Sequence, residues 1–135
     1  MKENKIKELP YIALIIIPYI YLFIIWENIA ESVPIHWDSN GSIDNYGSKW
    51  LLLLIPLILP GITYIALTLV PKIDPKKNIS KMGKKYDKLK FILTFVMFAL
   101  AMYIINKSSS SANTDINVIF VAIGFLFLVL GNYFK

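Results

Sequence analysis

Four long apolar stretches divide this chain, and they restrict its fold more than any other feature of the sequence does. They cover residues 9–26, 50–70, 89–105 and 116–134, while nearly all charged residues lie in the N-terminal tail and in the three segments between the stretches. A helix that crosses a bilayer needs about 20 predominantly apolar residues. The pattern therefore predicts an all-α membrane protein, with residues 1–135 forming a single integral membrane domain whose four transmembrane helices make a bundle.

The composition agrees with this class of protein. Hydrophobic residues make up 56% of the chain and charged residues 17%, against about 45–50% and about 25% in soluble domains. The third stretch is short for a span, and we expect the Lys90 side chain to extend it by reaching toward the interface. The first apolar run is longer than the core of a signal peptide, and no small-residue cleavage motif follows it, so we expect a retained helix. The chain has no cysteine, which excludes disulfide and thiolate chemistry.

The distribution of lysine predicts how the chain crosses the membrane. Four alternating helices would place twelve lysines on one side and only Lys49 and Lys107 on the other. The twelve are Lys2, Lys5, Lys7, Lys72, Lys76, Lys77, Lys81, Lys84, Lys85, Lys88, Lys90 and Lys135. Because basic residues accumulate in cytoplasmic segments, we expect both termini and the lysine-rich segment 72–88 in the cytoplasm. Aromatic residues near the span ends are typical of an interfacial belt: Tyr11, Trp26, Trp50 and Tyr133.

The interiors of the apolar stretches carry prolines and glycines but no ionisable side chain away from their ends. Intramembrane charges mark proton relays and ion pathways, so the sequence argues against a self-contained proton-coupled transporter. Pro56 and the pair Pro60-Gly61 would kink the second helix. Interrupted helices form binding sites in transporters, although proline and glycine are also simply common in membrane helices. Gly124 and Gly131 would allow close approach of a neighbouring helix.

The connection between the first two stretches, residues 27–49, holds most of the candidate site residues. It contains the only histidine, a tryptophan and four carboxylates. Pro34 favours an extended approach, Asn40-Gly41 is typical of a tight turn, and Tyr46-Gly47 indicates a second turn. Long loops in compact proteins are disproportionately functional, so we expect an ordered extracytoplasmic loop that binds a ligand. The predicted ligand-binding residues are Pro34, His36, Trp37, Asp38, Gly41, Asp44, Tyr46 and Lys49.

Several interpretations of this loop are open. Recognition of an extracellular peptide or lipid headgroup would use Trp37 and Tyr46 as amphipathic anchors. Hydrolysis would use His36 as a base beside Asp44, but the loop has no nucleophile elbow. In a purely structural interpretation Trp37 lies at the membrane interface and His36 satisfies a turn carbonyl. Asp44 then pairs with Lys49 and fixes the loop on the helix ends.

Metal binding is a further interpretation of the same loop. Asp38, Asn40, Ser42 and Asp44 alternate as calcium ligands do, but the position of the glycine and Lys49 at the twelfth position do not fit a calcium loop. Zinc would need more ligands than the single histidine and a carboxylate supply. We therefore expect no metal, no cofactor and no catalytic residue.

The loop also resembles a known family. Its spacing matches the signature of the domain of unknown function that begins the SdpI-like immunity proteins, through Pro34, His36, Trp37, Gly41, Asp44, Gly47 and Lys49. The family's cytoplasmic motif is similar to a second set of residues: Pro71, Ile73, Asp74, Pro75, Lys76, Asn78 and Tyr86. The end of the family's fourth helix is similar to Gly131-Asn132-Tyr133. Larger members continue beyond that point with another loop and two more helices.

The resemblance implies a multi-pass protein of the bacterial cell membrane. Some SdpI-like proteins protect the producing cell against a peptide toxin and take part in signalling. We therefore expect an immunity or signalling module whose outer loop recognises an extracellular peptide toxin or a lipid. The alternative is a subunit of a membrane transporter or lipid flippase, and a membrane-embedded enzyme comes third.

The basic segment 72–88 has two interpretations of its own. It holds seven lysines against Asp74 and Asp87, and membrane topology alone accounts for them. The same lysines would also attract anionic lipid or an acidic cytoplasmic regulator. Nucleic-acid binding is not expected, because the positive charge lies where topology requires it. The oligomeric state is left open, an oligomer included.

Overall fold

The computed structural model describes residues 2–110 and 116–133, and it is mostly helical. Three sequence predictions reach residues outside these ranges. They concern residues 111–115 of the segment before the fourth apolar stretch, residue 134 at the end of that stretch, and Lys135 of the lysine count. In chain order the helical and strand elements are α1 (Lys2–Ile25), η1 (Trp26–Asn28), β1 (Ser32–Trp37), β2 (Ile43–Ser48), η2 (Lys49–Leu54), η3 (Leu57–Gly61), α2 (Ile62–Ile73), α3 (Asn78–Lys81), α4 (Lys84–Ser110) and α5 (Ile116–Tyr133).

Three helical segments in the described part of the chain are long and apolar enough to cross a membrane. They are Lys7–Asn28, Lys49–Ile73 and Lys84–Ser109, and below they are called the first, second and third spans. A shorter apolar helix covers Phe120–Tyr133. The prediction of a mostly helical chain with apolar helices of membrane-spanning length is confirmed at this level.

The third span is longer than the sequence indicated. We expected a short apolar stretch from 89 to 105, whereas α4 is one continuous helix of 27 residues. Lysine is a good helix former, which favours the early start of the helix at Lys84. At its other end the helix continues through the polar residues 106–110. The third span therefore does not depend on Lys90 reaching out to the interface, and Lys90 lies six residues after the start of α4.

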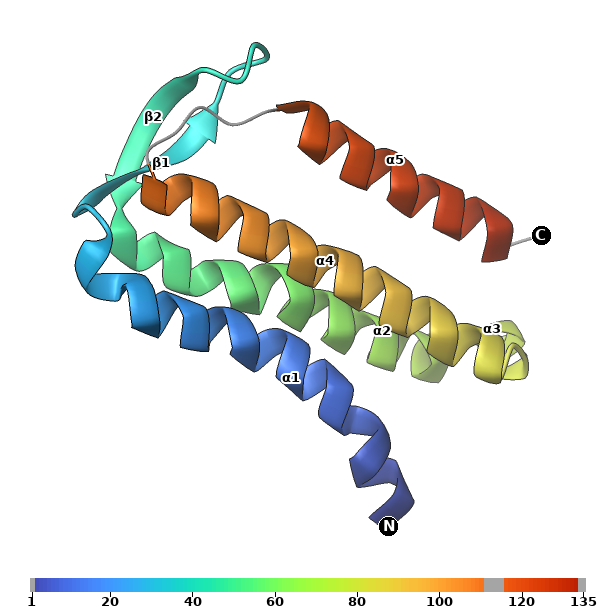
Figure 1. Cartoon of the computed structure of the whole chain (residues 1–135). Helices are drawn as coiled ribbons and strands as arrows, with labels where there is room; N and C mark the ends of the chain where they lie inside the picture. The colour runs from blue at the N-terminus through green and yellow to red at the C-terminus, as the bar shows by residue number, and fades with distance from the viewer. Residues whose placement is uncertain (1, 111–115, 134–135) are drawn as a thin grey trace.

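The helices lie side by side and separate two different ends of the molecule (Figure 1). The antiparallel strands β1 and β2 form a hairpin at one end, which we call the hairpin end. The opposite end carries the N-terminus, α3 and the start of α4, and we call it the lysine-rich end. The helix α5 runs along α4.

Each end has its own group of buried apolar side chains. Beneath the hairpin the group contains Leu22, Ile29, Val33, Leu52 and Ile105. At the lysine-rich end the group contains Tyr86, Leu89 and Leu93, with Leu67, Leu126 and Tyr133 packed against it. Many large apolar side chains point outward instead, and Phe23 is 85% exposed. An outward apolar surface of this kind marks a contact with lipid or another protein.

The second span is not a regular α-helix. It begins as the 3-10 helix η2, continues through the π-helix η3 and becomes α-helical only from Ile62. Pro56 and Pro60 lack the N–H that a regular helix needs, and a Cβ added at Gly61 would lie 3.3 Å from the Pro56 carbonyl oxygen. The sequence located this interruption. The suggestion that Gly124 and Gly131 allow close packing is wrong within the described residues, because an added Cβ at either would meet none of their atoms within 4 Å.

Candidate functional site

The candidate site is the β1–β2 hairpin, and its tip is shaped by one carboxylate. The Asp38 side chain accepts the backbone N–H groups of Asn40 at 2.8 Å and Ser42 at 2.9 Å. These hydrogen bonds, with Ser42 the larger contribution, lower the pKa of Asp38 below its usual value of 3.8. Gly41 has a φ of 81°, which a residue with a side chain adopts at a cost of about 1–2 kcal/mol. The predicted turn at Asn40-Gly41 is therefore present.

The second predicted turn, at Tyr46-Gly47, is wrong. Both residues lie within β2, where Tyr46 pairs with Pro34 and Gly47 pairs with Val33. The glycine serves packing instead of a reversal of the chain, because an added Cβ would lie 2.9 Å from Leu51 Cδ1 and 3.0 Å from the Ile35 side chain. Gly47 thus lets the hairpin approach the second span closely.

The two charged contacts of the hairpin differ from the predicted one. His36 Nδ1 lies 2.6 Å from Asp44 Oδ1, and Lys49 Nζ lies 2.7 Å from Glu31 Oε1. The expected pair between Asp44 and Lys49 is therefore wrong, and so is the expectation that His36 satisfies a turn carbonyl. The register of the two strands is irregular between His36 and Trp37, so that Asp44 has no directly paired residue on β1. A bulge of this kind changes the direction of a side chain, here that of Asp44. The His36 and Asp44 side chains are 67% and 45% exposed.

Lys49 anchors the base of the hairpin. It is only 9% exposed, and its Nζ lies 5.0 Å from the centroid of the Trp26 ring. The Trp26 and Trp50 rings meet edge to face at 5.0 Å, and the Lys49 backbone N–H donates to the Glu31 carbonyl at 3.0 Å. Lys49 was predicted to contact a ligand, but its contacts fix the hairpin to the ends of the first and second spans.

A serine that the sequence did not single out holds the hairpin to the third span. The buried Ser108 hydroxyl donates a hydrogen bond to the Pro34 carbonyl oxygen at 3.3 Å. Pro34 and Val33 are both buried. The sequence placed Ser108 in a connecting segment, because a run of serines after Lys107 is typical of a loop. A serine in the last turns of an apolar helix was the signal that could have identified it.

Trp37 contains a buried donor with no acceptor in the described part of the chain. Its side chain is half-buried, and its indole Nε1 has no hydrogen-bond partner among residues 2–110 and 116–133. More than 90% of buried polar groups in proteins are paired, and an unpaired one costs about 1–3 kcal/mol. By contrast Ile35, His36, Asp44 and Tyr46 are exposed. The hairpin therefore combines a fixed frame with a set of accessible side chains.

The chemistry that this geometry allows is limited. The His36 imidazole and the Asp44 carboxylate are arranged like a catalytic base and the carboxylate that orients it. Within the described residues, the hydrogen bond of the His36 side chain is the one with Asp44. Of the oxygen atoms considered for calcium, Asp38 Oδ1 already accepts two backbone N–H groups. No group of three His, Asp or Glu side chains that could hold a metal ion occurs in the described ranges.

The second predicted motif lies at the lysine-rich end and forms a helical turn. Asp74 Oδ2 accepts the Ile79 N–H at 2.8 Å and Asp74 Oδ1 accepts the Lys76 N–H at 3.1 Å. These bonds lower the pKa of Asp74 from 3.8, with Ile79 the largest cause and the Asn78 N–H a smaller one. Asp74 is the C-cap of α2, Pro75 follows it, and Lys77, the N-cap of α3, has a φ of 54°. The motif thus starts α3.

Tyr86, the last residue of that motif, joins two spans. Its side chain is buried, and its hydroxyl donates to the Leu67 carbonyl at 2.6 Å. Leu67 belongs to α2 and Tyr86 to α4. Asp74 and Tyr86 lie at the end opposite to the hairpin, so the structure does not bring the two sequence motifs together.

Sequence reasoning missed a polar cluster at the lysine-rich end. The Tyr64 hydroxyl hydrogen-bonds to Glu8, and the Tyr11 ring lies 5.1 Å from the Tyr64 ring. Lys90 Nζ lies 4.5 Å from the centroid of the Tyr11 ring. Tyr11 was predicted to be an interfacial anchor, but it is buried. The lysine within an apolar helix was the only signal, and it gave no indication of its aromatic neighbours.

Comparison with known families gives one match. Residues 13–59 match a family described as a domain of unknown function, DUF1648. The matched segment contains the C-terminal half of α1, the whole hairpin and the interrupted start of the second span. Comparison with curated proteins and with solved structures gave no match.

Proposed function

We propose that this chain is an SdpI-like immunity or signalling module that recognises an extracellular peptide toxin or lipid through its hairpin. In this proposal α5 is a fourth span, both termini are cytoplasmic, and the hairpin is an ordered outer loop. The match of residues 13–59 to a domain of unknown function is consistent with the SdpI-like signature in the hairpin. The lysine-rich end would then face the cytoplasm, as the lysine asymmetry requires.

The unpaired indole N–H of Trp37 is the observation that carries recognition. A buried donor without an acceptor gains free energy from an acceptor that reaches it, and a peptide carbonyl or a lipid phosphate oxygen would supply one. The exposed Tyr46 and the His36–Asp44 pair lie on the same two strands. Aromatic side chains with a polar end are the usual anchors of such contacts.

Survival of a toxin-sensitive bacterium tests this proposal. Cells that express the chain are challenged with a membrane-active peptide toxin of the kind that SdpI-like proteins counter. Trp37→Phe keeps an aromatic ring and removes only the N–H, so we expect protection per folded molecule to fall at least tenfold. Trp50→Phe is the matched control, because Trp50 packs on Trp26, and it should retain protection. Equal protection by wild type and Trp37→Phe contradicts recognition through this group.

Orientation is tested by labelling. A cysteine introduced at Ser42, in the hairpin tip, should react with an impermeant reagent in intact cells, and one at Ser80, in α3, should react only after lysis. The chain has no natural cysteine, so each label reports one site. Labelling of Ser80→Cys in intact cells would reverse the orientation and place the hairpin in the cytoplasm.

A transporter or flippase subunit is the second candidate, and the interrupted second span favours it. Non-α segments at membrane depth occur where a helix end lines a binding site, and η2 and η3 are such segments. Proteoliposomes that contain the chain and a fluorescent phospholipid distinguish the two candidates. An immunity module protects cells without moving lipid, whereas a flippase changes how the fluorescent lipid is distributed between the leaflets.

A further inference from the structure

A buried lysine without an acid partner lies at the lysine-rich end. Lys90 is 8% exposed, and its Nζ lies over two aromatic rings, 4.5 Å from the Tyr11 centroid and 5.2 Å from the Tyr64 centroid. No ion pair among residues 2–110 and 116–133 includes Lys90. A lysine ammonium has three donors. The Lys90 ammonium is not among the fully buried, unpaired polar groups of the described residues, so it is accessible at the protein surface and can donate to an anionic or polar partner.

A hollow that could hold such a partner lies beside Lys90. A hollow of about 490 Å³ lies between α1 and α4, lined by Lys7, Glu8, Pro10, Tyr11, Asp87, Lys90 and Phe91. Its charged lining consists of two ammonium groups and two carboxylates. A separate hollow of about 420 Å³, between α4 and α5, is lined by three lysines, Asn132 and Tyr133, with no carboxylate. The charges of the first hollow thus fit a ligand that carries both signs.

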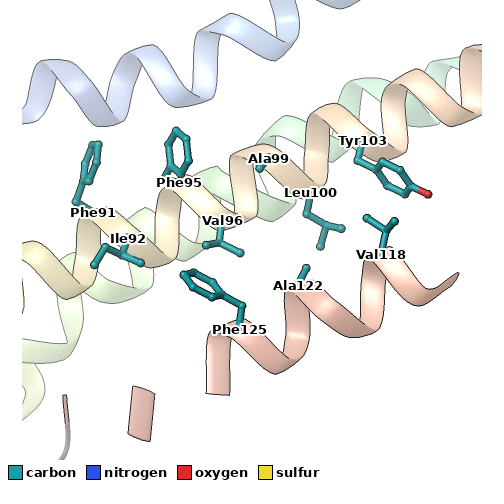
Figure 2. A pocket seen from close by; sticks show the side chains of 10 residues that line it. All are labelled: Phe91, Ile92, Phe95, Val96, Ala99, Leu100, Tyr103, Val118, Ala122 and Phe125. Carbon is teal, nitrogen blue, oxygen red and sulfur yellow. The ribbon is translucent and has the colours of Figure 1, made fainter. Parts of the chain in front are cut away.

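An apolar groove lies next to this hollow and shares one lining residue with it. Phe91 lines both the hollow and a groove of about 320 Å³ between α4 and α5. In Figure 2 the Phe91 and Phe95 rings project toward α1, whereas Val96 and Leu100 face Ala122 and Phe125 of α5. A ligand that fits both spaces has a charged group at one end and a hydrocarbon chain at the other.

We propose that this hollow and groove bind one zwitterionic aminophospholipid. The ammonium groups of Lys90 and Lys7 donate to its phosphate, and the carboxylates of Glu8 and Asp87 accept from its primary ammonium. One acyl chain lies along the groove that starts at Phe91. Tyr64 occupies one oxygen of Glu8, and a carboxylate retains further acceptor sites on its other oxygen. The site lies at the end opposite to the hairpin and is independent of ligand recognition there.

The charge and the hydrogen-bonding groups of the lining select this headgroup. An anionic phospholipid would leave Glu8 and Asp87 facing a negative charge, which costs free energy. A choline headgroup carries a cation that cannot donate a hydrogen bond to either carboxylate. A primary ammonium satisfies both carboxylates, and the phosphate satisfies the buried Lys90.

Lipid binding to the delipidated full-length chain tests the proposal. The purified protein is titrated in detergent with phosphatidylethanolamine, phosphatidylglycerol or phosphatidylcholine of identical acyl chains, and bound lipid is counted by native mass spectrometry. We expect phosphatidylethanolamine to bind at least tenfold more tightly than the other two. Lys90→Met should abolish this preference. Lys72→Met is the matched control, because Lys72 is exposed in the last turn of α2 and lines neither hollow, and it should change the affinity less than twofold.

A second variant keeps the test valid if Lys90→Met fails to fold. Glu8→Gln can still accept from Tyr64 but removes one negative charge, so we expect the selectivity to move at least fivefold toward phosphatidylglycerol. A loss of packing alone would weaken all three lipids equally. Equal affinities for the three lipids in wild type, or tighter binding of phosphatidylglycerol, would overturn the assignment. Displacement of the lipid by millimolar inorganic phosphate would also overturn it, by showing that the site binds free phosphate.

Discussion

The two ends of the helices each bury a lysine against aromatic rings, and the two lysines differ in how their charge is balanced. At the hairpin end, Lys49 contacts Trp26 and pairs with Glu31, whose side chain is 82% exposed. At the lysine-rich end, Lys90 contacts Tyr11 and Tyr64, but no ion pair in the described part of the chain includes it. Similar burial thus serves two purposes. Lys49 makes contacts within the protein that fix the hairpin to the spans, whereas Lys90 is available to contact the proposed ligand.

The largest effect should come from filling the space that closes the hairpin end. Gly47→Val would place methyl groups against Leu51 and Ile35, where even a Cβ lies within about 3 Å of both. Overpacking of this kind costs about 1–3 kcal/mol. We expect faster hydrogen exchange throughout β1 and β2, with the lysine-rich end unchanged.

Gly124→Ala provides the matched control, since an added Cβ there meets nothing. Unchanged exchange in Gly47→Val would show that the hairpin does not pack on the second span.

Substitution of the two lysines should change the free energy of unfolding in opposite directions when the protein is in detergent without added lipid. Lys49→Met removes a pair and a cation–π contact, so we expect the free energy of unfolding to fall by about 1 kcal/mol. Lys90→Met removes two cation–π contacts but no ion pair, and it exchanges a largely buried ammonium for an apolar side chain, so we expect a rise of about 1 kcal/mol. Thermal unfolding of the two variants measures the difference. A loss of stability in both would mean that the two environments are equivalent.

The smallest effect should be a loss of stabilisation at low pH, which we expect at both ends of the molecule. Backbone N–H groups lower the pKa of Asp38 in the hairpin tip and of Asp74 before α3. Because each pKa is depressed in the folded state, the stabilisation is present above about pH 4 and is lost as the pH falls through the folded value. We expect the amide resonances of Ser42 and Ile79 to move in that window.

Asp38→Asn should remove the response at Ser42 and leave the response at Ile79. A response of the Ser42 amide between pH 5 and 7 would be inconsistent with Asp38 as its cause.

Apolar length was enough to predict helices of spanning length, because the bilayer sets that length physically. The Asn40-Gly41 turn was also predictable, since the positive φ of Gly41 is a local requirement. The pairing of Asp44 was not predictable. The irregular register between His36 and Trp37 decides that contact, and a register depends on how two strands meet. The Glu8–Tyr64 contact was missed for a related reason, because it joins residues that are far apart in the chain and periodicity does not relate them.

The junction between β2 and the second span has a consequence for chain length. The strand ends at Ser48 and η2 begins at Lys49, so the two elements share a joint without a linker. Each residue of a 3-10 helix turns the chain by about 120°. One residue inserted at this joint would move Lys49 away from Glu31 and Trp26, whereas one inserted after Ser39 would disturb only the hydrogen bonds that Asp38 makes within the tip. We therefore expect related chains to vary in length at the tip and to keep a constant length from Gly47 to Trp50.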